Sequence, residues 1–317
     1  KSQEDYFKQN NVKGISSSHA VYTNGIPLRI AVKKRIDAFI CVDTRLYKID
    51  YKSCSFKNKT NGFDYQFKLF RKTFNNFSKE KKKIYLKKGQ SFLNEVVKGK
   101  KNYFYMPSFN KGKKIKKIFK KNRLKKIVIF AHSFFDSPHV YGNFLFPDFY
   151  EWLRFLSKIS LKTNYDWYLK PHPNAFKEEK IINQFLKENP NIKKINSNVK
   201  NINLVKEGLD YGLTVYGSCA AELSYFGIKV VNADINNPHY RYNFSFNPKN
   251  VKEYEEIILN LKDKKLKFSK KELYEFHYMN QFYFHNHYIF KDYAKYHKSI
   301  NGRQLMYTNK IIKDWMK

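Results

Sequence analysis

The sequence predicts an α/β fold, in which helices cover both faces of a parallel sheet. Between residues 126 and 232, short apolar runs rich in β-branched residues alternate with segments whose apolar residues recur every three or four positions. The connections between these segments are short, as they are between the strands and helices of a parallel sheet. Polar residues and glycines follow directly after the apolar runs. Because such sheets bind ligands at the carboxyl ends of their strands, this distribution also predicts where the functional site lies.

The apolar runs predict five strands, the first of which is expected to be buried on both faces. They are expected at residues 126–131, 165–169, 192–195, 212–216 and 229–232. The helical patterns predict helices at residues 147–160, 178–188, 201–207, 218–226, 251–261 and from 270 onward. Asn189-Pro190 ends the second of these helices because proline cannot continue a helix, and Gly208 and Gly227 end the next two.

The first 110 residues are less regular. Residues 18–25 resemble a loop at a strand end, and a helix at 26–34 and a strand at 38–42 follow. We interpret this region as the last portion of a second α/β domain. The sequence therefore predicts two Rossmann-type domains with parallel sheets. An incomplete N-terminal domain with a basic linker is expected over residues 1–112, a C-terminal domain over 113–300, and a helical tail over 301–317.

Positive charge is the most prominent feature of the composition. The 62 Lys and Arg residues and 27 Asp and Glu residues give a formal net charge of +35. Lys, Asn, Ile, Phe and Tyr are abundant together, which indicates the amino-acid bias of an AT-rich genome. The basic clusters at 79–88 and 111–126 are alternatively a surface for anionic lipid headgroups, or a solvated linker. No RNA-binding signature or zinc-finger spacing is present, so a nucleic-acid partner is not expected.

The cysteines and the hydropathy predict a cytoplasmic protein. Cys41, Cys54 and Cys219 are odd in number and lack CxxC spacing, which argues against a disulfide framework and a zinc site. No apolar run approaches the ~20 residues needed to span a bilayer, and no signal peptide is visible. We expect neither a metal ion nor another cofactor.

Four polar segments fall at the predicted ligand-binding edge, at residues 132–139, 170–174, 217–218 and 233–239. In the second, Lys170-Pro-His-Pro173 follows a strand directly, and its prolines fix the loop that presents Lys170 and His172. Two preset donors of this kind suit a nucleotide phosphate, where negative charge develops as the bond to a sugar breaks. The alternative is a rigid turn with a solvent-facing histidine.

A second anion site is predicted at Tyr216-Gly-Ser-Cys-Ala-Ala-Glu222, where a strand, a turn and a helix meet. The backbone N–H groups after Gly217 and the Ser218 hydroxyl would lie at the helix N-terminus. Glu222, one turn further along the same face, can accept hydrogen bonds from ribose hydroxyls. The alternative makes Ser218 a helix N-cap and Glu222 a partner of the helix dipole.

Together these segments resemble the capsule polysaccharide biosynthesis family, which includes bacterial Kdo transferases. The matching residues are HSFFDSPH at 132–139, KPHP at 170–173, TVYGSCAAE at 214–222 and GIKVV at 227–231. The resemblance implies a GT-B fold and a nucleotide-activated sugar donor, with a CMP-linked sugar as one candidate, and no metal ion. Polysialyltransferases and glycerol-phosphate polymerases also carry His-Pro elements at this place, so the resemblance leaves the donor open.

The resemblance also implies roles for single residues. Asp136 would be the catalytic carboxylate, as a nucleophile toward the anomeric carbon or a base on the acceptor hydroxyl. The alternative is an Asp that braces the Ser137-Pro138 turn or caps a helix. His172 would share the catalytic role. The donor-binding residues would be Lys170, His172, Gly217, Ser218 and Glu222, to which the strand-end positions add His132, His139 and His239.

We therefore expect a metal-independent glycosyltransferase that moves a sugar from a nucleotide donor to a surface or capsular polysaccharide or a glycolipid. Kdo or another CMP-activated acid sugar is the candidate. The protein is expected in the cytoplasm, peripherally at the inner membrane. Two alternatives stay open: a non-catalytic nucleotide-binding or polysaccharide-assembly module, and a transferase for glycerol-phosphate polymers.

Overall fold

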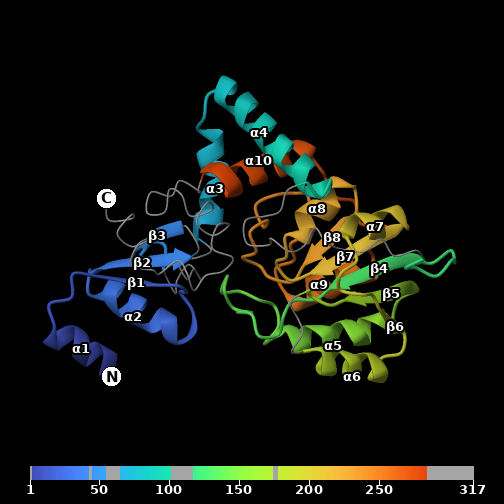
Figure 1. Cartoon of the computed structure of the whole chain (residues 1–317), viewed down its shortest axis with the longest axis horizontal. Helices are drawn as coiled ribbons and strands as arrows, with labels where there is room; N and C mark the ends of the chain where they lie inside the picture. Colours follow the sequence, from blue (N-terminus) through green and yellow to red (C-terminus); the bar gives the residue numbers. More distant parts are fainter. Residues whose placement is uncertain (1, 43–44, 55–64, 101–116, 174–177, 284–317) are drawn as a thin grey trace. The chain divides into compact units, whose positions relative to one another are not determined.

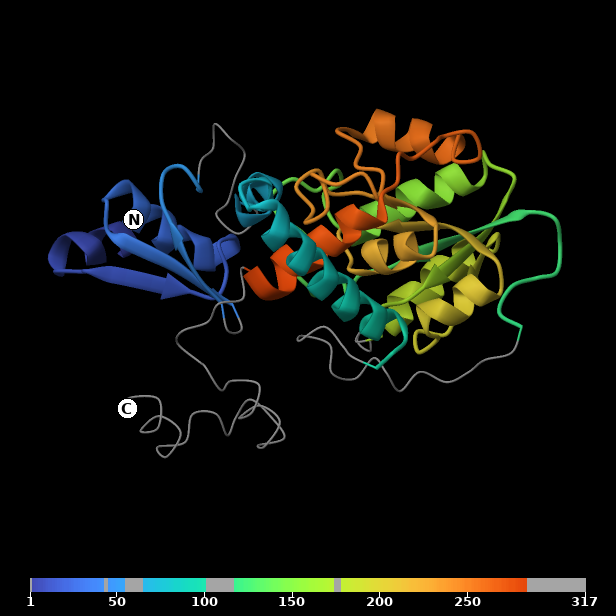
Figure 2. The same cartoon turned by 90° about the horizontal axis from the view of Figure 1, so that it is seen from above.

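The computed structural model describes residues 2–42, 45–54, 65–100, 117–173 and 178–283 (Figures 1 and 2). The chain divides into two compact units, Lys1–Phe63 with Asn280–Lys317, and Asp64–Met279. The predicted domain boundaries at 112 and 300 and the predicted tail lie outside the described residues. Each unit contains a sheet with parallel strands and flanking helices, which confirms the predicted α/β fold class.

The larger unit is built on a five-stranded sheet in which all neighbouring strands are parallel. Its strands are β4 (Lys125–Phe130), β5 (Tyr165–Lys170), β6 (Ile192–Lys194), β7 (Leu209–Thr214) and β8 (Lys229–Asn232). They lie in the order β6-β5-β4-β7-β8, so the direction of winding reverses between β4 and β7. Ligands of such sheets bind at the carboxyl end of the strands, at this reversal.

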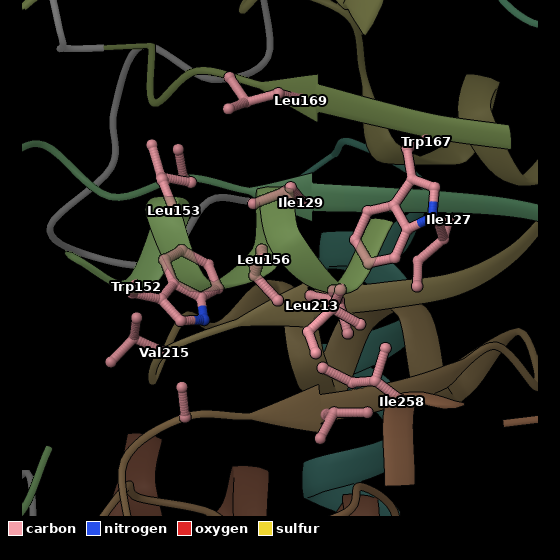
Figure 3. Packing of buried hydrophobic residues seen from close by; sticks show 14 of the residues in the cluster. Ile127, Ile129, Trp152, Leu153, Leu156, Trp167, Leu169, Leu213, Val215 and Ile258 are labelled. Carbon is pink, nitrogen blue, oxygen red and sulfur yellow. The ribbon is translucent and has the colours of Figure 1, made fainter. Parts of the chain in front are cut away.

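Helices cover both faces of this sheet. The helices α5 (Phe149–Ser160), α6 (Glu179–Glu188) and α9 (Val251–Leu259) share one apolar cluster with the strands, and α7 (Asn201–Lys206) and α8 (Cys219–Tyr225) share another. In the first cluster, Leu153 and Leu156 of α5 lie against the strands and are fully buried (Figure 3). Each stabilises the fold by about 1.5–3 kcal/mol. Trp152 is buried without loss because its indole N–H donates to the Tyr254 hydroxyl at 2.8 Å.

The five predicted strands and the helices between them are confirmed, in part by their capping residues. Asp148 accepts the Glu151 N–H at 2.8 Å and begins α5. Gly208 and Gly227 follow α7 and α8 with φ of +94° and +80°, a left-handed conformation that costs glycine little. Strand β7 begins at Leu209, earlier than the predicted start at residue 212. Asp210, a residue typical of turns, fits into the strand because its carboxylate accepts the backbone N–H of Lys126 at 2.8 Å.

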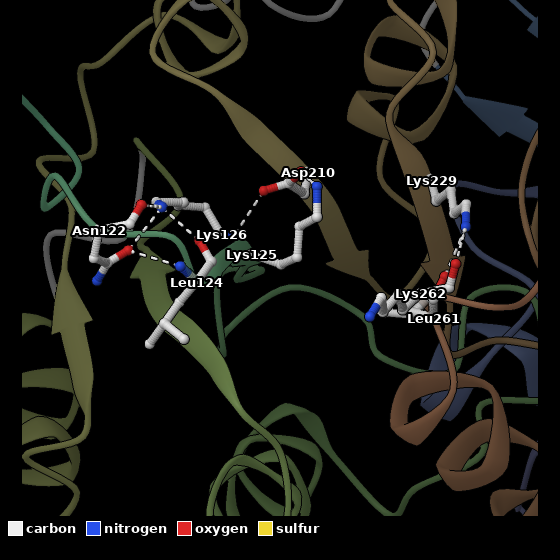
Figure 4. Close-up of polar contacts among 8 residues, drawn as sticks. All are labelled: Asn122, Leu124, Lys125, Lys126, Asp210, Lys229, Leu261 and Lys262. Carbon is white, nitrogen blue, oxygen red and sulfur yellow. Dashed lines mark hydrogen bonds and ion pairs between the residues drawn. The ribbon is translucent and has the colours of Figure 1, made fainter.

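Two lysines of the predicted basic segment 111–126 hold the start of β4 (Figure 4). Lys125 Nζ lies 2.9 Å from Asp210 Oδ1. Lys126 is 9% exposed, and its Nζ donates to the backbone O and the Oδ1 of Asn122 at 2.9 and 2.8 Å. The prediction of a lipid-facing charge is therefore wrong for Lys126, whose ammonium is used inside the fold. Residues 111–116 of the segment lie outside the described residues.

Residues 79–97 form a helix of the larger unit and not a linker. This helix is α4 (Lys79–Val97), and α3 (Tyr65–Asn75) precedes it. Helix α4 packs on α10 (Lys270–Tyr278), which the π-helical turn η2 (Met279–Tyr283) continues. Tyr85 stacks on Tyr278 with ring centroids 4.1 Å apart. At Gly89 the helices approach so closely that a Cβ would lie 2.0 Å from the Tyr274 carbonyl oxygen. This helix was hard to recognise from the sequence because exposed lysines outnumber its few buried residues.

The smaller unit contains α1 (Ser2–Gln9), α2 (Tyr22–Lys33) and the strands β1 (Gly14–Ser17), β2 (Asp37–Val42) and β3 (Arg45–Ile49). Strands β1 and β2 are parallel and connected through α2, while β3 pairs antiparallel with β2, so this sheet is mixed. The predicted strand at 38–42 is confirmed. The predicted helix at 26–34 begins earlier, at Tyr22, because Gly25 lets it pack on the Ala20 backbone.

Candidate functional site

Polar side chains gather at the carboxyl edge of the large sheet. His132 follows β4, Lys170 ends β5 with His172 two residues beyond, and Thr214 ends β7. Glu222 lies in the first turn of α8. These positions are the ones that the strand-end rule selects, and the electrostatic contacts described below link them into one cluster.

Lys170 is the charged centre of this cluster. The residue is 7% exposed, and its Nζ lies 6.0 Å from the centroid of the Phe130 ring. Burial lowers its pKa to about 8, although the Cys219 and Glu222 side chains act to raise it. Among the described residues, no hydrogen bond from the ammonium is found. A buried cation without hydrogen-bond acceptors favours binding of an anion.

Glu222 is the carboxylate that interacts electrostatically with Lys170. Burial raises the pKa of its carboxyl, while a hydrogen bond from Asn201 and the charge of Lys170 oppose the rise. The Asn201 amide donates to Glu222 Oε2 at 3.0 Å. Oε1 receives no hydrogen bond within the described part of the chain, so it can accept one from a hydroxyl group. Sequence reasoning missed Asn201, because an Asn at the start of a short helix gives no signal by itself.

His132 is held as a neutral ring beside Thr214. Its ring stacks on Phe149 with centroids 5.0 Å apart, and Nε2 lies 3.2 Å from Thr214 Oγ1. Burial and the neighbouring His172 lower its pKa to about 3. Gly217 is required at this place, since a Cβ there would lie 2.8 Å from Thr214 Oγ1 and 3.7 Å from His132 Nε2. His132 is therefore a buried, neutral member of the cluster at neutral pH.

His172 connects the cluster to the loop after β4. Burial and Lys170 lower its pKa, whereas the carboxylates of Asp136 and Glu178 act to raise it. The structure thus brings Asp136 into the electrostatic neighbourhood of His172, as predicted. Asp136 itself is exposed, and its Oδ1 accepts the Ser137 N–H at 2.8 Å. This bond also fits the alternative in which Asp136 braces the turn.

Glu178 is a functional candidate that sequence reasoning took only for a helix start. It is 1% exposed, and its Oε1 accepts the Ser133 hydroxyl at 2.5 Å and the Phe135 N–H at 3.4 Å. Burial acts to raise its pKa, but the hydrogen bond from Ser133 and those from the loop backbone outweigh it, so the pKa is lowered. No sequence pattern links Glu178 to a loop that lies 45 residues earlier.

Three further residues, Ser218, His139 and His239, were also predicted to bind the donor. Ser218 stands at the N-cap position of α8, which has 7 residues, but its side chain makes no capping hydrogen bond. His139 lies half-buried in the loop after β4, where its carbonyl accepts the Gly142 N–H at 2.8 Å. His239 is 2% exposed and packs edge-on against Phe276, with centroids 4.8 Å apart. Its ring lies in an aromatic cluster with Phe244 and Phe276. The strand-end rule could not predict this packing because it gives the position of the backbone and not the direction of the side chain.

Two searches of the described residues bear on other classes of protein. No group of three or more His, Cys, Asp or Glu side chains in this part of the chain is arranged to bind a metal ion. None of the described helices combines the length and the apolar character that crossing a membrane requires.

No protein-family model matches the sequence, and no curated protein matches it. The structure is similar to a solved KpsC from Thermosulfurimonas dismutans, a beta Kdo 2,7 transferase, with a TM-score of 0.51 at 13% identity over 86% of this chain and 78% of that chain. A KpsC beta Kdo 2,4 transferase of the same organism gives 0.49 at 11% identity over 83% and 78%. A UDP-GlcNAc 2-epimerase of Methanocaldococcus jannaschii, solved with UDP-GlcNAc and UDP, gives 0.36 at 12% identity over 86% and 76%. The chain has a GT-B-like fold of the kind found in the KpsC Kdo transferases.

Proposed function

We propose that this chain is a glycosyltransferase that takes a sugar from a nucleotide donor and transfers it to a capsular or other surface polysaccharide, or to a glycolipid. The fold shared with a KpsC beta Kdo 2,7 transferase and the charged cluster at the sheet edge support this function. We propose Kdo as the transferred sugar, following the activity of that neighbour. Another CMP-activated acid sugar, which the sequence resemblance implies as a candidate, is the alternative donor.

The buried Lys170 ammonium is the observation that carries the proposal. A donor phosphate would supply the hydrogen bonds that the described residues do not, and charge-assisted bonds of this kind are strong. Negative charge grows on the phosphate as the sugar leaves, and a fixed cation beside it stabilises the transition state. We propose that the Lys170 cation, and not a metal ion, balances that charge, with His172 beside it as a hydrogen-bond donor.

Asp136 and Glu222 complete the proposed site. Asp136 is exposed on the loop after β4 and acts electrostatically on His172. From this place it would act on the anomeric carbon as a nucleophile, or on the acceptor hydroxyl as a base. Glu222 Oε1 would accept a hydrogen bond from the donor ribose.

A non-catalytic nucleotide-binding module is the second candidate, because the bond from the Ser137 N–H already gives Asp136 a structural role. Both candidates bind nucleotide, but only a transferase consumes the donor. Incubation of the chain with CMP-, CDP- and UDP-linked donors separates them. A CDP-linked glycerol donor in the same panel tests the alternative of glycerol-phosphate transfer.

Isothermal titration with CMP, CDP and UDP tests the assignment of the phosphate site. We expect Lys170→Ala and His172→Ala each to weaken nucleotide binding, by about 10-fold or more for Lys170, the scale of one hydrogen bond to a charged group. Lys125→Ala is the matched control, since it removes an exposed lysine at the amino-terminal end of strand β4, away from the carboxyl ends of the strands. Unchanged affinity in both site variants would exclude these residues from the phosphate site.

We also propose that the protein works in the cytoplasm and binds peripherally to the inner membrane through α4. The face of α4 turned away from its buried residues Gly89, Phe92 and Leu93 carries exposed lysines and Ile84, which is 61% exposed. These lysines are Lys79, Lys83, Lys87 and Lys88. Each would contribute about 1 kcal/mol at an anionic surface.

Co-sedimentation with phosphatidylglycerol vesicles tests this surface. The variant with Lys83→Gln, Lys87→Gln and Lys88→Gln is expected to lose most of the binding, and added salt should weaken binding of the wild type because screening acts over about 8 Å. Lys125→Gln removes a lysine elsewhere and serves as the control. Equal binding to neutral phosphatidylcholine vesicles would contradict the proposal.

A further inference from the structure

Glu178 is a buried carboxylate that the proposed reaction does not use. It lies directly before α6 and is held by the Ser133 hydroxyl at 2.5 Å and the Phe135 N–H at 3.4 Å. Within the described ranges, no ion pair joins it to a Lys or Arg. Burying an ionised carboxylate is costly unless its surroundings compensate for the lost hydration.

The two hydrogen bonds alone do not require a negative charge. A Gln side chain at position 178 would also present an oxygen to Ser133 and Phe135, at a lower desolvation cost. The negative charge of Glu178 also acts electrostatically on His172, whose protonated form it favours. The bonds act on the loop, and the charge acts on the histidine.

His172 is surrounded by charges of both signs. Lys170, at the end of β5, faces it as a cation, and His132, after β4, faces it as a neutral ring. Asp136, on the loop after β4, and Glu178, before α6, are the carboxylates that face it. Burial and Lys170 both disfavour a proton on His172, so the two carboxylates are what opposes its loss.

We propose that Glu178 is a positioning residue of the site, which fixes the turn that carries Asp136 and holds a negative charge beside His172. The turn is fixed because Ser133 and Phe135, the residues bound to Glu178, lie within three positions of Asp136 along the chain, and the Asp136 N–H donates to the Ser133 carbonyl at 3.1 Å. A protonated His172 would stabilise the leaving phosphate, a step that rests on the proposed function.

The test compares three variants of the full chain: Glu178→Gln, Ser133→Ala and the control Glu179→Gln. Glu179 is the adjacent carboxylate, but it is exposed and paired with Lys194 at 3.1 Å. The His172 ring is titrated by NMR, with its signal assigned from the spectrum of His172→Ala. We expect Glu178→Gln to shift the titration midpoint of His172 down by about one pH unit, the lower end of the effect of a close opposite charge. Ser133→Ala and Glu179→Gln should leave the midpoint unchanged.

Turnover of the donor supplies the second measurement. Ser133→Ala is expected to lower kcat by about 10-fold, around the lower end of the range for general acid–base groups, because the turn at Asp136 loses its bond to Glu178. Glu178→Gln keeps that bond and is expected to lower kcat to a similar extent because the negative charge beside His172 is lost. An unchanged His172 midpoint in folded Glu178→Gln, or a kcat of Ser133→Ala equal to that of Glu179→Gln, would overturn the proposal. Ser133→Ala deletes a single hydroxyl and keeps the test valid if Glu178→Gln does not fold. A wild-type chain that consumes no donor would end the proposed function, while the His172 titration would still decide the charge effect of Glu178.

Discussion

Two groups of buried histidines in the larger unit have similar pKa shifts and different surroundings. Burial lowers the pKa of His132, at the sheet edge, to about 3, and it does the same for His239 in the aromatic cluster. His277, in that second group, is lowered to about 4. A lowered pKa is therefore no sign of function by itself, because packing among rings produces it as well as a binding site does.

The difference lies in the charges around the rings. Lys170, Asp136 and Glu178 act on His172, whereas no Lys, Asp or Glu contributes to the shifts of His239 and His277. His277 also makes a local hydrogen bond, in which its Nδ1–H donates to the Leu273 carbonyl at 2.8 Å. These opposed charges support our proposal that the group at the carboxyl ends of the strands forms the site. The following changes test that distinction in order of expected effect.

Asp136→Asn should produce the largest effect. Asn can still accept the Ser137 N–H, so a bracing role would be preserved, while the charge and basicity are lost. We expect turnover to fall by about 10² or more, as when a general base is removed, with nucleotide affinity kept. Near wild-type turnover in a folded variant would leave Asp136 with a structural role only.

Lys170→Met should change how stability depends on pH. The folded pKa of Lys170, about 8, lies below its ordinary value of 10.5, so the unfolded chain holds more protons between these values. The free energy of unfolding of the wild type should therefore rise with pH from about 8 to 10.5, by up to about 3 kcal/mol, and this contribution should be absent from Lys170→Met.

Urea titrations of both proteins at pH 7.5, 9 and 10 measure the difference, which removes the effects of the other lysines and tyrosines. Lys125→Met serves as the control, because that side chain is half-exposed. Parallel pH profiles for wild type and Lys170→Met would show that Lys170 is not a buried cation.

Gly217→Ala tests how closely the site is packed. The added Cβ would lie 2.8 Å from Thr214 Oγ1 and 3.2 Å from Cys219 Sγ, so a side chain must move. We expect a loss of about 1–2 kcal/mol in the free energy of unfolding and weaker nucleotide binding. Gly14→Ala is the control, since its Cβ would approach no atom closer than 3.5 Å. Equal stability of the two variants in urea would contradict the close packing.

His239→Phe should have the smallest effect on the ligand. Its ring packs against Phe244 and Phe276, so a phenyl ring can replace it, and nucleotide affinity should stay within about twofold, as for independent sites. A 10-fold loss in isothermal titration would return His239 to the donor site and remove the contrast between the two groups of histidines.

The periodic parts of the larger unit could be predicted from the sequence. Apolar runs and glycines define β4, β5, α7 and α8, because each pattern reports local geometry and burial. Helix α4 could not be predicted with the same ease, since its lysines mask a buried face of few residues.

The site was predicted only as far as the strand ends define it. Lys170, His172 and Glu222 follow from their places after strands, and the structure brings them together. Glu178 and Asn201 could not be found, because their partners Ser133 and Glu222 are distant in sequence and contact is decided by the tertiary fold. The packing of the His239 ring on Phe276 could not be found for the converse reason, since the strand-end rule gives the position of the backbone and not the direction of the side chain.

The close approach of α4 and α10 at Gly89 decides where the chain can be divided for expression. A fragment that begins at residue 113 lacks α4 and leaves the ring of Tyr278, which Tyr85 covers, exposed to water. The face of His277 toward Phe92 would be uncovered as well. Such a fragment is expected to aggregate. A fragment that begins at Asp64 retains α4 and is the shortened form of the chain that we expect to suit nucleotide titrations.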